Sequence, residues 1–109
     1  MADNTTAPKI EWDSEIATGT ADSTGETIAW NGTFSGAVGV MISNVESSGG
    51  SLLVGVNIAL GDLTQSLRTV LIAPGECYSL PVNPEAQLIR VKGLGADVDY
   101  CAQRFRWQR

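Results

Sequence analysis

The sequence predicts an all-β protein with one antiparallel β-sandwich or barrel, jelly-roll-like, of seven or eight short strands. Short apolar runs alternating with polar residues recur at intervals of roughly 8 to 12 residues, with Gly or Pro between them. No segment shows the 3.6-residue period of an amphipathic helix. The chain has 109 residues, enough for one hydrophobic core and too few for two. These three observations together favour a single two-sheet domain.

The N-terminal part, residues 1–25, is expected to be an extended arm and a connector, with the sandwich in residues 26–109. Residues 1–8 are polar and lack periodicity, which is typical of an arm. In the next five residues, Ile10 and Trp12 alternate with charged side chains, so both lie on one face of a short predicted strand. Ser14 to Glu26 is rich in Ser, Thr, Gly and Ala, which predicts a loop or an extended connector.

Two hairpins are predicted after the connector. Asn31-Gly32 is the dipeptide most typical of a two-residue type I′ turn, so residues 27–34 are expected to form the first hairpin. Residues 38–44 and 52–58 are alternating apolar runs on either side of a Ser-Gly loop, and they are expected to pair as the second.

Residues 71–91 contain three apolar runs separated by turns, which predicts a β-meander. Pro74 presets the backbone for the second position of a type II turn, and Gly75 can adopt the positive φ that the third position needs. Residues 60–66 are expected to form a turn or one helical turn. Around the last turn of the meander, Ile89 and Val91 are predicted to face the core, with Arg90 and Lys92 facing solvent.

The last predicted strand runs from Val98 to Trp107 and changes character along its length. Its first half places small and apolar residues on one face, whereas Phe105 and Trp107 lie on the opposite face together with Cys101. Such a change predicts either a β-bulge or a strand end that a partner covers.

The charge distribution excludes some classes of partner and suggests another. The net charge of −5 argues against nucleic acid, because a nucleic-acid-binding surface must be basic. No apolar run reaches the roughly 18 to 20 residues of a membrane span, so a membrane partner is not expected either. Lys9 is the only basic residue before Arg68, and this asymmetry predicts a contact between the basic tail and the acidic first third of another subunit or another acidic protein. A simple solvated tail is the alternative. The candidate interface residues are Ile10, Trp12, Arg104, Phe105, Arg106 and Trp107.

No catalytic, cofactor-binding or metal-binding residues are predicted. The chain has no histidine, which removes the most common general base and metal ligand. Asp97 and Asp99 share a strand face but lack further ligands. Cys77 and Cys101 lie on separate predicted strands, where buried free thiols are favoured, although a disulfide stays open.

Four segments carry a family resemblance. They are Ile42-Ser43-Asn44 with its Ser-Gly loop, Leu52-Leu53-Val54-Gly55-Val56-Asn57, Leu71-Ile72-Ala73-Pro74-Gly75-Glu76 and Leu88-Ile89-Arg90-Val91-Lys92-Gly93. Their order resembles that in small β-sandwich proteins of tailed bacteriophages, which include capsid decoration (cement) proteins. The resemblance covers roughly residues 38–101. It implies an extended N-terminal arm and assigns no functional residue.

The resemblance implies a non-enzymatic virion protein that binds the outer surface of a phage head and stabilises it. The implied partners are the major capsid protein and further copies of the chain, as a trimer, with synthesis in the host cytoplasm and a final place on the capsid. A small tail or baseplate component is an alternative within the same class. From another class, a carbohydrate- or receptor-binding sandwich would use Trp12, Trp30 or Tyr78 as a platform. An enzyme ranks third.

Overall fold

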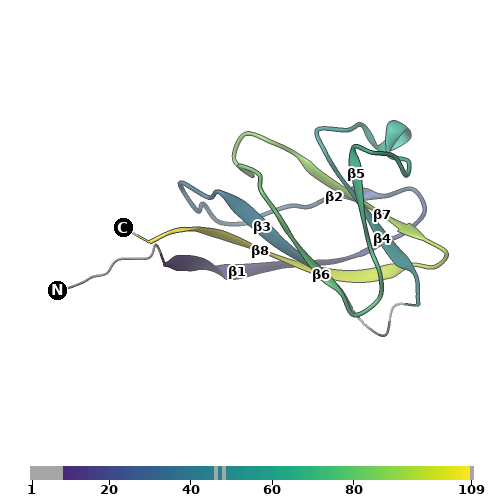
Figure 1. Ribbon diagram of the computed structural model, residues 1–109, viewed down its shortest axis with the longest axis horizontal. Helices are drawn as coiled ribbons and strands as arrows, with labels where there is room; N and C mark the ends of the chain where they lie inside the picture. Colours follow the sequence, from purple (N-terminus) through teal and green to yellow (C-terminus); the bar gives the residue numbers. More distant parts are fainter. Residues whose placement is uncertain (1–8, 46, 48, 109) are drawn as a thin grey trace.

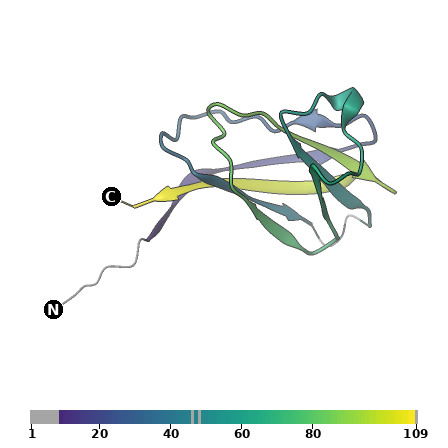
Figure 2. The same cartoon turned by 45° about the horizontal axis from the view of Figure 1, so that its top comes forward.

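A computed structural model describes residues 9–45, 47 and 49–108 and confirms the all-β sandwich. Two four-stranded antiparallel sheets pack face to face, one in the order β1-β8-β3-β6 and the other in the order β2-β7-β4-β5 (Figures 1 and 2). The predicted arm, residues 1–8, lies outside the described residues. The strands are β1 (Ile10–Ala21), β2 (Glu26–Thr27), β3 (Gly39–Asn44), β4 (Ser51–Val56), β5 (Thr69–Ile72), β6 (Cys77–Leu80), β7 (Ile89–Leu94) and β8 (Val98–Trp107), with a 3₁₀ turn η2 (Leu60–Asp62).

The strands pair as a set of nested hairpins. β4 pairs with β5, β3 with β6, β2 with β7 and β1 with β8, all antiparallel. This nesting is the winding of a jelly roll. As a consequence, each connection except the one from β4 to β5 carries the chain from one sheet to the other.

The predicted second hairpin and the predicted meander are therefore wrong. β3 and β4 belong to opposite sheets, and so do β5 and β6. The Pro74-Gly75 turn itself is confirmed: Gly75 has a φ of 81°, and the Glu76 N–H donates to the Ala73 carbonyl at 3.0 Å. Alternation along a strand shows that one face is buried, but it does not show which sheet the strand joins.

Asn44, at the end of β3, forms hydrogen bonds with two of the connections that pass from one sheet to the other. Its buried side-chain Nδ2 donates to the Gly50 carbonyl at 2.9 Å and to the Ile72 carbonyl at 2.8 Å. Its backbone N–H donates to the Glu76 carbonyl and its carbonyl accepts from Gly75, each at 2.9 Å. The connections from β3 to β4 and from β5 to β6 are thus fastened to one residue.

The predicted connector is wrong for most of its length, because β1 continues to Ala21. Ala17 and Ala21 lie in the core, and a Cβ at Gly19 would collide with the Tyr100 hydroxyl and the Glu26 carboxylate. The small residues that suggested a loop are there because β1 packs closely against its neighbours. Only the segment after Ala21 connects β1 to β2.

The main core lies between the sheets and is entirely apolar at its centre. Ile89 and Val91 face inward as predicted, with Ile42, Leu52 and Val54 from β3 and β4. At one rim the Tyr100 hydroxyl donates to Glu26, which joins the two sheets, and burial raises the pKa of Tyr100.

A smaller apolar cluster covers the outside of one sheet. Leu53 points away from the main core and is covered by Ile58 and Leu63, on either side of the predicted turn at η2. Lys92 was predicted to face solvent on the outside of this sheet. Its ammonium group donates to the Leu63 carbonyl at 3.0 Å and so binds the segment that covers Leu53. The β2-β7-β4-β5 sheet is therefore buried on both faces where this segment crosses it.

Replacing Asn44 by Ala is expected to lower the free energy of unfolding by about 2 kcal/mol or more, because the buried Gly50 and Ile72 carbonyls lose their donor. The matched control is Asn31→Ala, at an exposed residue, with an expected change within about 0.5 kcal/mol. Urea denaturation of both variants measures the difference. Equal losses would show that Asn44 does not fasten the two connections.

Candidate interaction surface

The solvent-facing side of the β1-β8-β3-β6 sheet is almost free of charge. Side chains alternate along each strand, and the register places Trp12 opposite Phe105, and Thr18 opposite Cys101, on this side. Among the described residues of the four strands its one charged side chain is Asp99, which accepts a 2.6 Å hydrogen bond from Thr20. We call this side the outer face; it consists of Ile10, Trp12, Ile16, Thr18, Thr20, Gly39, Met41, Ser43, Cys77, Ser79, Asp99, Cys101, Gln103, Phe105 and Trp107.

Four apolar residues lie where β1 begins and β8 ends, and these two strand ends run side by side in both views (Figures 1 and 2). Ile10, Trp12 and Trp107 are 45%, 43% and 51% exposed. Phe105 lies between Trp12, at 5.3 Å between ring centroids, and Gly39, where a Cβ would overlap the Phe105 ring. We call these four residues the aromatic end of the outer face.

Farther along the same face is a hollow of about 80 Å³. Ile16 stands at its rim and is 54% exposed. The neighbouring strands β3 and β8 supply the rest of its wall, and the hollow is lined by Ile16, Met41, Ser43, Cys101, Ala102 and Gln103. We call it the central hollow.

Both cysteines lie on the outer face as free thiols. Cys77 and Cys101 are each opposite Ser43, on the two strands that flank β3. They are thus two strand spacings apart, about 9.5 Å, which is too far for a disulfide. The expectation that these thiols are buried is wrong, because Cys77 is exposed and Cys101 is only half-buried.

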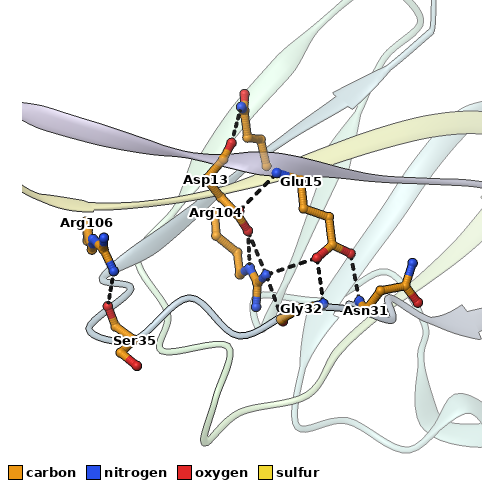
Figure 3. Close-up of polar contacts among 8 residues, drawn as sticks. Asp13, Glu15, Asn31, Gly32, Ser35, Arg104 and Arg106 are labelled. Carbon is orange, nitrogen blue, oxygen red and sulfur yellow. Dashed lines mark hydrogen bonds and ion pairs between the residues drawn. The ribbon is translucent and has the colours of Figure 1, made fainter.

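The opposite side of β1 and β8 holds a buried charged group (Figure 3). Arg104 is 3% exposed, and its guanidinium donates to Asp13 at 2.6 Å and to the Gly32 carbonyl at 3.0 Å. Its guanidinium carbon also lies 4.5 Å from the Trp30 ring centroid. A buried arginine needs such complete pairing, since an unpaired charge there would be strongly destabilising.

A β-bulge brings the acidic residues to Arg104. The register shifts between Trp12 and Ile16, so three residues of β1 stand where β8 has only Arg104. The bulge is closed locally by the Glu15 N–H, which donates to the Asp13 carboxylate at 3.0 Å, and by Gln103, which donates to the Asp13 carbonyl at 2.7 Å. The sequence pattern placed the irregularity on the last strand, whereas the structure places it on β1.

Glu15 explains why the predicted Asn31-Gly32 hairpin is wrong. Its two carboxylate oxygens accept hydrogen bonds from the backbone N–H groups of Asn31 at 2.7 Å and Gly32 at 2.8 Å (Figure 3). These hydrogen bonds, with the nearby Arg104, hold the pKa of Glu15 below its usual value. The backbone at Asn31-Gly32 turns around the Glu15 carboxylate of β1. Strand β2 ends at Thr27, before this dipeptide, so no hairpin forms there.

Arg106 is engaged in the same way nearer to solvent. It donates to both oxygens of Glu11, at 3.3 and 3.0 Å, and to the Ser35 carbonyl at 2.8 Å. Its guanidinium carbon lies 4.1 Å from the Phe34 ring centroid. An open depression of about 540 Å³ lies here, lined by Glu11, Ser35, Arg106 and Gln108, and its arginine is already paired within the chain.

The six predicted interface residues thus divide between two sides of the sheet. The apolar four form the aromatic end, and the two arginines pair with acidic residues of the same chain. The predicted pairing of the basic tail with the acidic first third therefore occurs within one chain. The sequence analysis missed the central hollow. The alternation of apolar and polar residues that begins at Ile10 and Trp12 continues to Ile16, and it could have placed Ile16 on the same face.

The three aromatic residues proposed as a sugar platform lie on different surfaces. Trp12 is on the outer face, and Trp30 is covered by Arg104. Tyr78 pairs with Ile42 and therefore faces the other way from Trp12.

Within residues 9–45, 47 and 49–108, no three acidic or cysteine side chains are grouped as metal ligands. The same residues contain no helix long and apolar enough to cross a membrane. Comparison with family models, curated proteins and solved structures finds no match to this chain.

Arg104→Leu is expected to lower the free energy of unfolding by about 3 to 5 kcal/mol, because it leaves Asp13 buried without its partner. Arg106→Leu is the matched control and should cost much less, since its ion pair with Glu11 is partly exposed. Both values come from urea denaturation. A loss for Arg104→Leu no larger than that of the control would contradict the central role of Arg104.

Glu15 should make the fold sensitive to acid. Because its pKa is lowered in the folded state, its contribution to stability is complete above its unfolded pKa of about 4.3 and is lost as the pH falls through the folded value. The difference in unfolding free energy between the wild type and Glu15→Gln should therefore shrink as the pH is lowered from 7 toward 3. Urea denaturation across this range tests the sign; a difference that grows in acid would refute it.

Proposed function

We propose that this protein is a non-enzymatic structural component of a tailed-phage virion, a decoration protein that binds the outer surface of the head and stabilises it. The observation that carries the proposal is the aromatic end: two half-exposed tryptophans and an isoleucine together on a face that is almost free of charge. Large exposed apolar groups of this kind mark protein contact surfaces.

Tryptophan is the residue type most enriched among those that dominate binding energy at protein interfaces. Trp12 packs against the Phe105 ring, so little of its side-chain freedom is lost on binding. Trp107 lies opposite Ile10 in the β1-β8 pairing. On a particle with many identical sites, a modest affinity per contact is multiplied if the bound copies are also linked to one another. The major capsid protein is the partner proposed for the aromatic end, with the capsid surface as its location after synthesis in the host cytoplasm.

Two further considerations support the proposal. The pattern of residues 38–101 resembles that of small phage virion sandwiches. The nested strand pairing is that of a jelly roll, a fold common among viral capsid proteins and lectins, which is an argument by analogy alone. A small tail or baseplate component would share both features.

The alternative of a carbohydrate-binding module has less support. Of the three residues offered as alternative platforms, Trp30 is covered by Arg104, while Trp12 and Tyr78 are exposed on different surfaces. The proposal assigns no catalytic step to the protein.

Trp107→Ser is expected to weaken binding to phage heads at least tenfold, as for an interface hot spot. The probe is the capsid of the parent phage assembled without this protein, and the readout is the amount of protein in the pellet at increasing concentration. Tyr78→Ser removes an aromatic residue of similar exposure, 44%, from another surface and should bind as the wild type does.

Saturation at a fixed ratio to the major capsid protein would support decoration. No binding by the wild type would refute it, and equal binding by the wild type and Trp107→Ser would remove the aromatic end from the proposal. A glycan array, with Trp107→Ser as the control variant, distinguishes the carbohydrate-binding alternative from capsid decoration.

A further inference from the structure

We propose that Asn31 is a modification site, at which deamidation converts the side-chain amide to a carboxylic acid, and that the Glu15 carboxylate protects this site in the folded chain. Loss of the two hydrogen bonds to Glu15 opens Asn31 to the reaction. The inference goes beyond the proposed function. It concerns the side of β8 that holds Arg104, opposite the outer face and its aromatic end.

The sequence supplies one asparagine whose neighbour suits this reaction. Deamidation begins when the backbone nitrogen of the following residue attacks the side-chain carbonyl carbon of the asparagine. A side chain on the following residue hinders the attack, and glycine has none. Gly32 follows Asn31, whereas the remaining asparagines precede Thr, Val, Ile or Pro. Asn31 is therefore the asparagine with the highest intrinsic reactivity in the chain.

The reaction balances with water as its only co-reactant. The Gly32 nitrogen forms a bond to Asn31 Cγ and gives its proton to solvent, while the Asn31 side-chain nitrogen takes up a proton and leaves as ammonia. Water then opens the resulting imide ring. Cleavage of the new bond gives aspartate, and cleavage of the original peptide bond gives isoaspartate, in which the chain continues through the side chain. Asn31 and Gly32 are both exposed, so water reaches the site.

The folded chain holds the attacking nitrogen away from the asparagine side chain. The Gly32 N–H donates to Glu15 Oε1 at 2.8 Å, and the Asn31 N–H donates to Oε2 at 2.7 Å (Figure 3). The Gly32 carbonyl accepts from Arg104 at 3.0 Å. Ring closure must turn the backbone at Asn31 and break these hydrogen bonds. Hydrogen bonds to charged groups are roughly twice as strong as neutral ones, so the rotation is opposed on both sides of Gly32.

A carboxylate beside the reacting nitrogen could instead act as a base and accelerate the attack. The contacts of Glu15 argue against this role. Hydrogen bonds from Asn31 and Gly32 lower the pKa of Glu15, and so does the Arg104 charge. A weakly basic carboxylate is a poor acceptor for the proton of a backbone amide. Its charge also disfavours the negative charge that develops on the Gly32 nitrogen.

Modification of Asn31 removes the contact that protects it. Aspartate adds a negative charge beside Glu15, and like charges at hydrogen-bonding range repel one another. Isoaspartate lengthens the backbone by one methylene, which displaces the Gly32 N–H from Glu15. The same loop places the Trp30 ring 4.5 Å from the guanidinium carbon of Arg104. A change at one exposed amide thus loosens the loop that packs on the buried arginine.

The test measures the rate of deamidation at Asn31 by peptide mapping with mass spectrometry, after incubation of the free protein at mildly alkaline pH. Glu15→Ala removes both acceptor oxygens and should react at least about tenfold faster than the wild type. Glu11→Ala is the matched control. It removes a glutamate of the same strand that pairs with Arg106, and it should keep the wild-type rate. The wild type unfolded in urea gives the unprotected rate.

Two further variants separate loss of this contact from global unfolding. Asn44→Ala is expected to destabilise the fold at another place, so it should not raise the rate at Asn31 as Glu15→Ala does. Should Glu15→Ala fail a thermal unfolding check, Glu15→Gln keeps the shape of the side chain and one acceptor oxygen. Its rate should lie between those of the folded wild type and the unfolded chain.

A folded wild type that reacts as fast as the unfolded chain would overturn the inference. Equal rates in Glu15→Ala and Asn44→Ala would do the same, because they would assign the protection to global folding alone. A slower reaction in Glu15→Ala would make Glu15 the base of the reaction and would also contradict the proposal. These measurements use the free protein, so their outcome is independent of capsid binding.

Discussion

The buried guanidinium of Arg104 is the interaction on which most of this structure depends. Removed from water, it requires partners on all sides, and it obtains them from a bulge in β1, from the Gly32 carbonyl and from the Trp30 ring. The bulge aligns Asp13 and Glu15 with it, and Glu15 in turn fixes the loop after β2 through two backbone N–H groups. One charge therefore sets the shape of a strand and of a loop that is distant in the sequence.

The same arrangement determines which surface is left for contact. Because Arg104 and Arg106 point to the inner side of β8, the residues between and after them, Phe105 and Trp107, must point outward. Charge is concentrated on one side of the β1-β8 pair and apolar area on the other. The outer face thus follows from strand alternation once the arginines are placed, and it can hold both an aromatic end and a central hollow because β1 is long.

The parts of the fold that depend on local patterns could be predicted from the sequence. Period-two alternation identified most strands, and Pro74-Gly75 identified its turn with the correct positive φ. Pairing could not be predicted, because in a jelly roll neighbours in sequence mostly join opposite sheets. The Asn31-Gly32 signal failed because a carboxylate from β1 took the N–H groups of the turn, a long-range effect that no local pattern contains. Of the candidate interface, the four apolar residues share one surface, while the acidic partners of the two arginines proved to be in the same chain.

The nested winding also bears on how the chain reaches this state. β4 and β5 are close in sequence and can pair early, whereas β8, the strand neighbour of β1 in its sheet, follows all the other described strands along the chain. Closing so long a loop is slow, since the entropy of the intervening chain must be lost before the contacts form. Until then Asp13 and Glu15 lack Arg104, and Trp12 lacks the ring it packs against. The β1-β8 pairing is therefore expected to form after that of β4 and β5, and β1 stays an unpaired strand edge until β8 has been made.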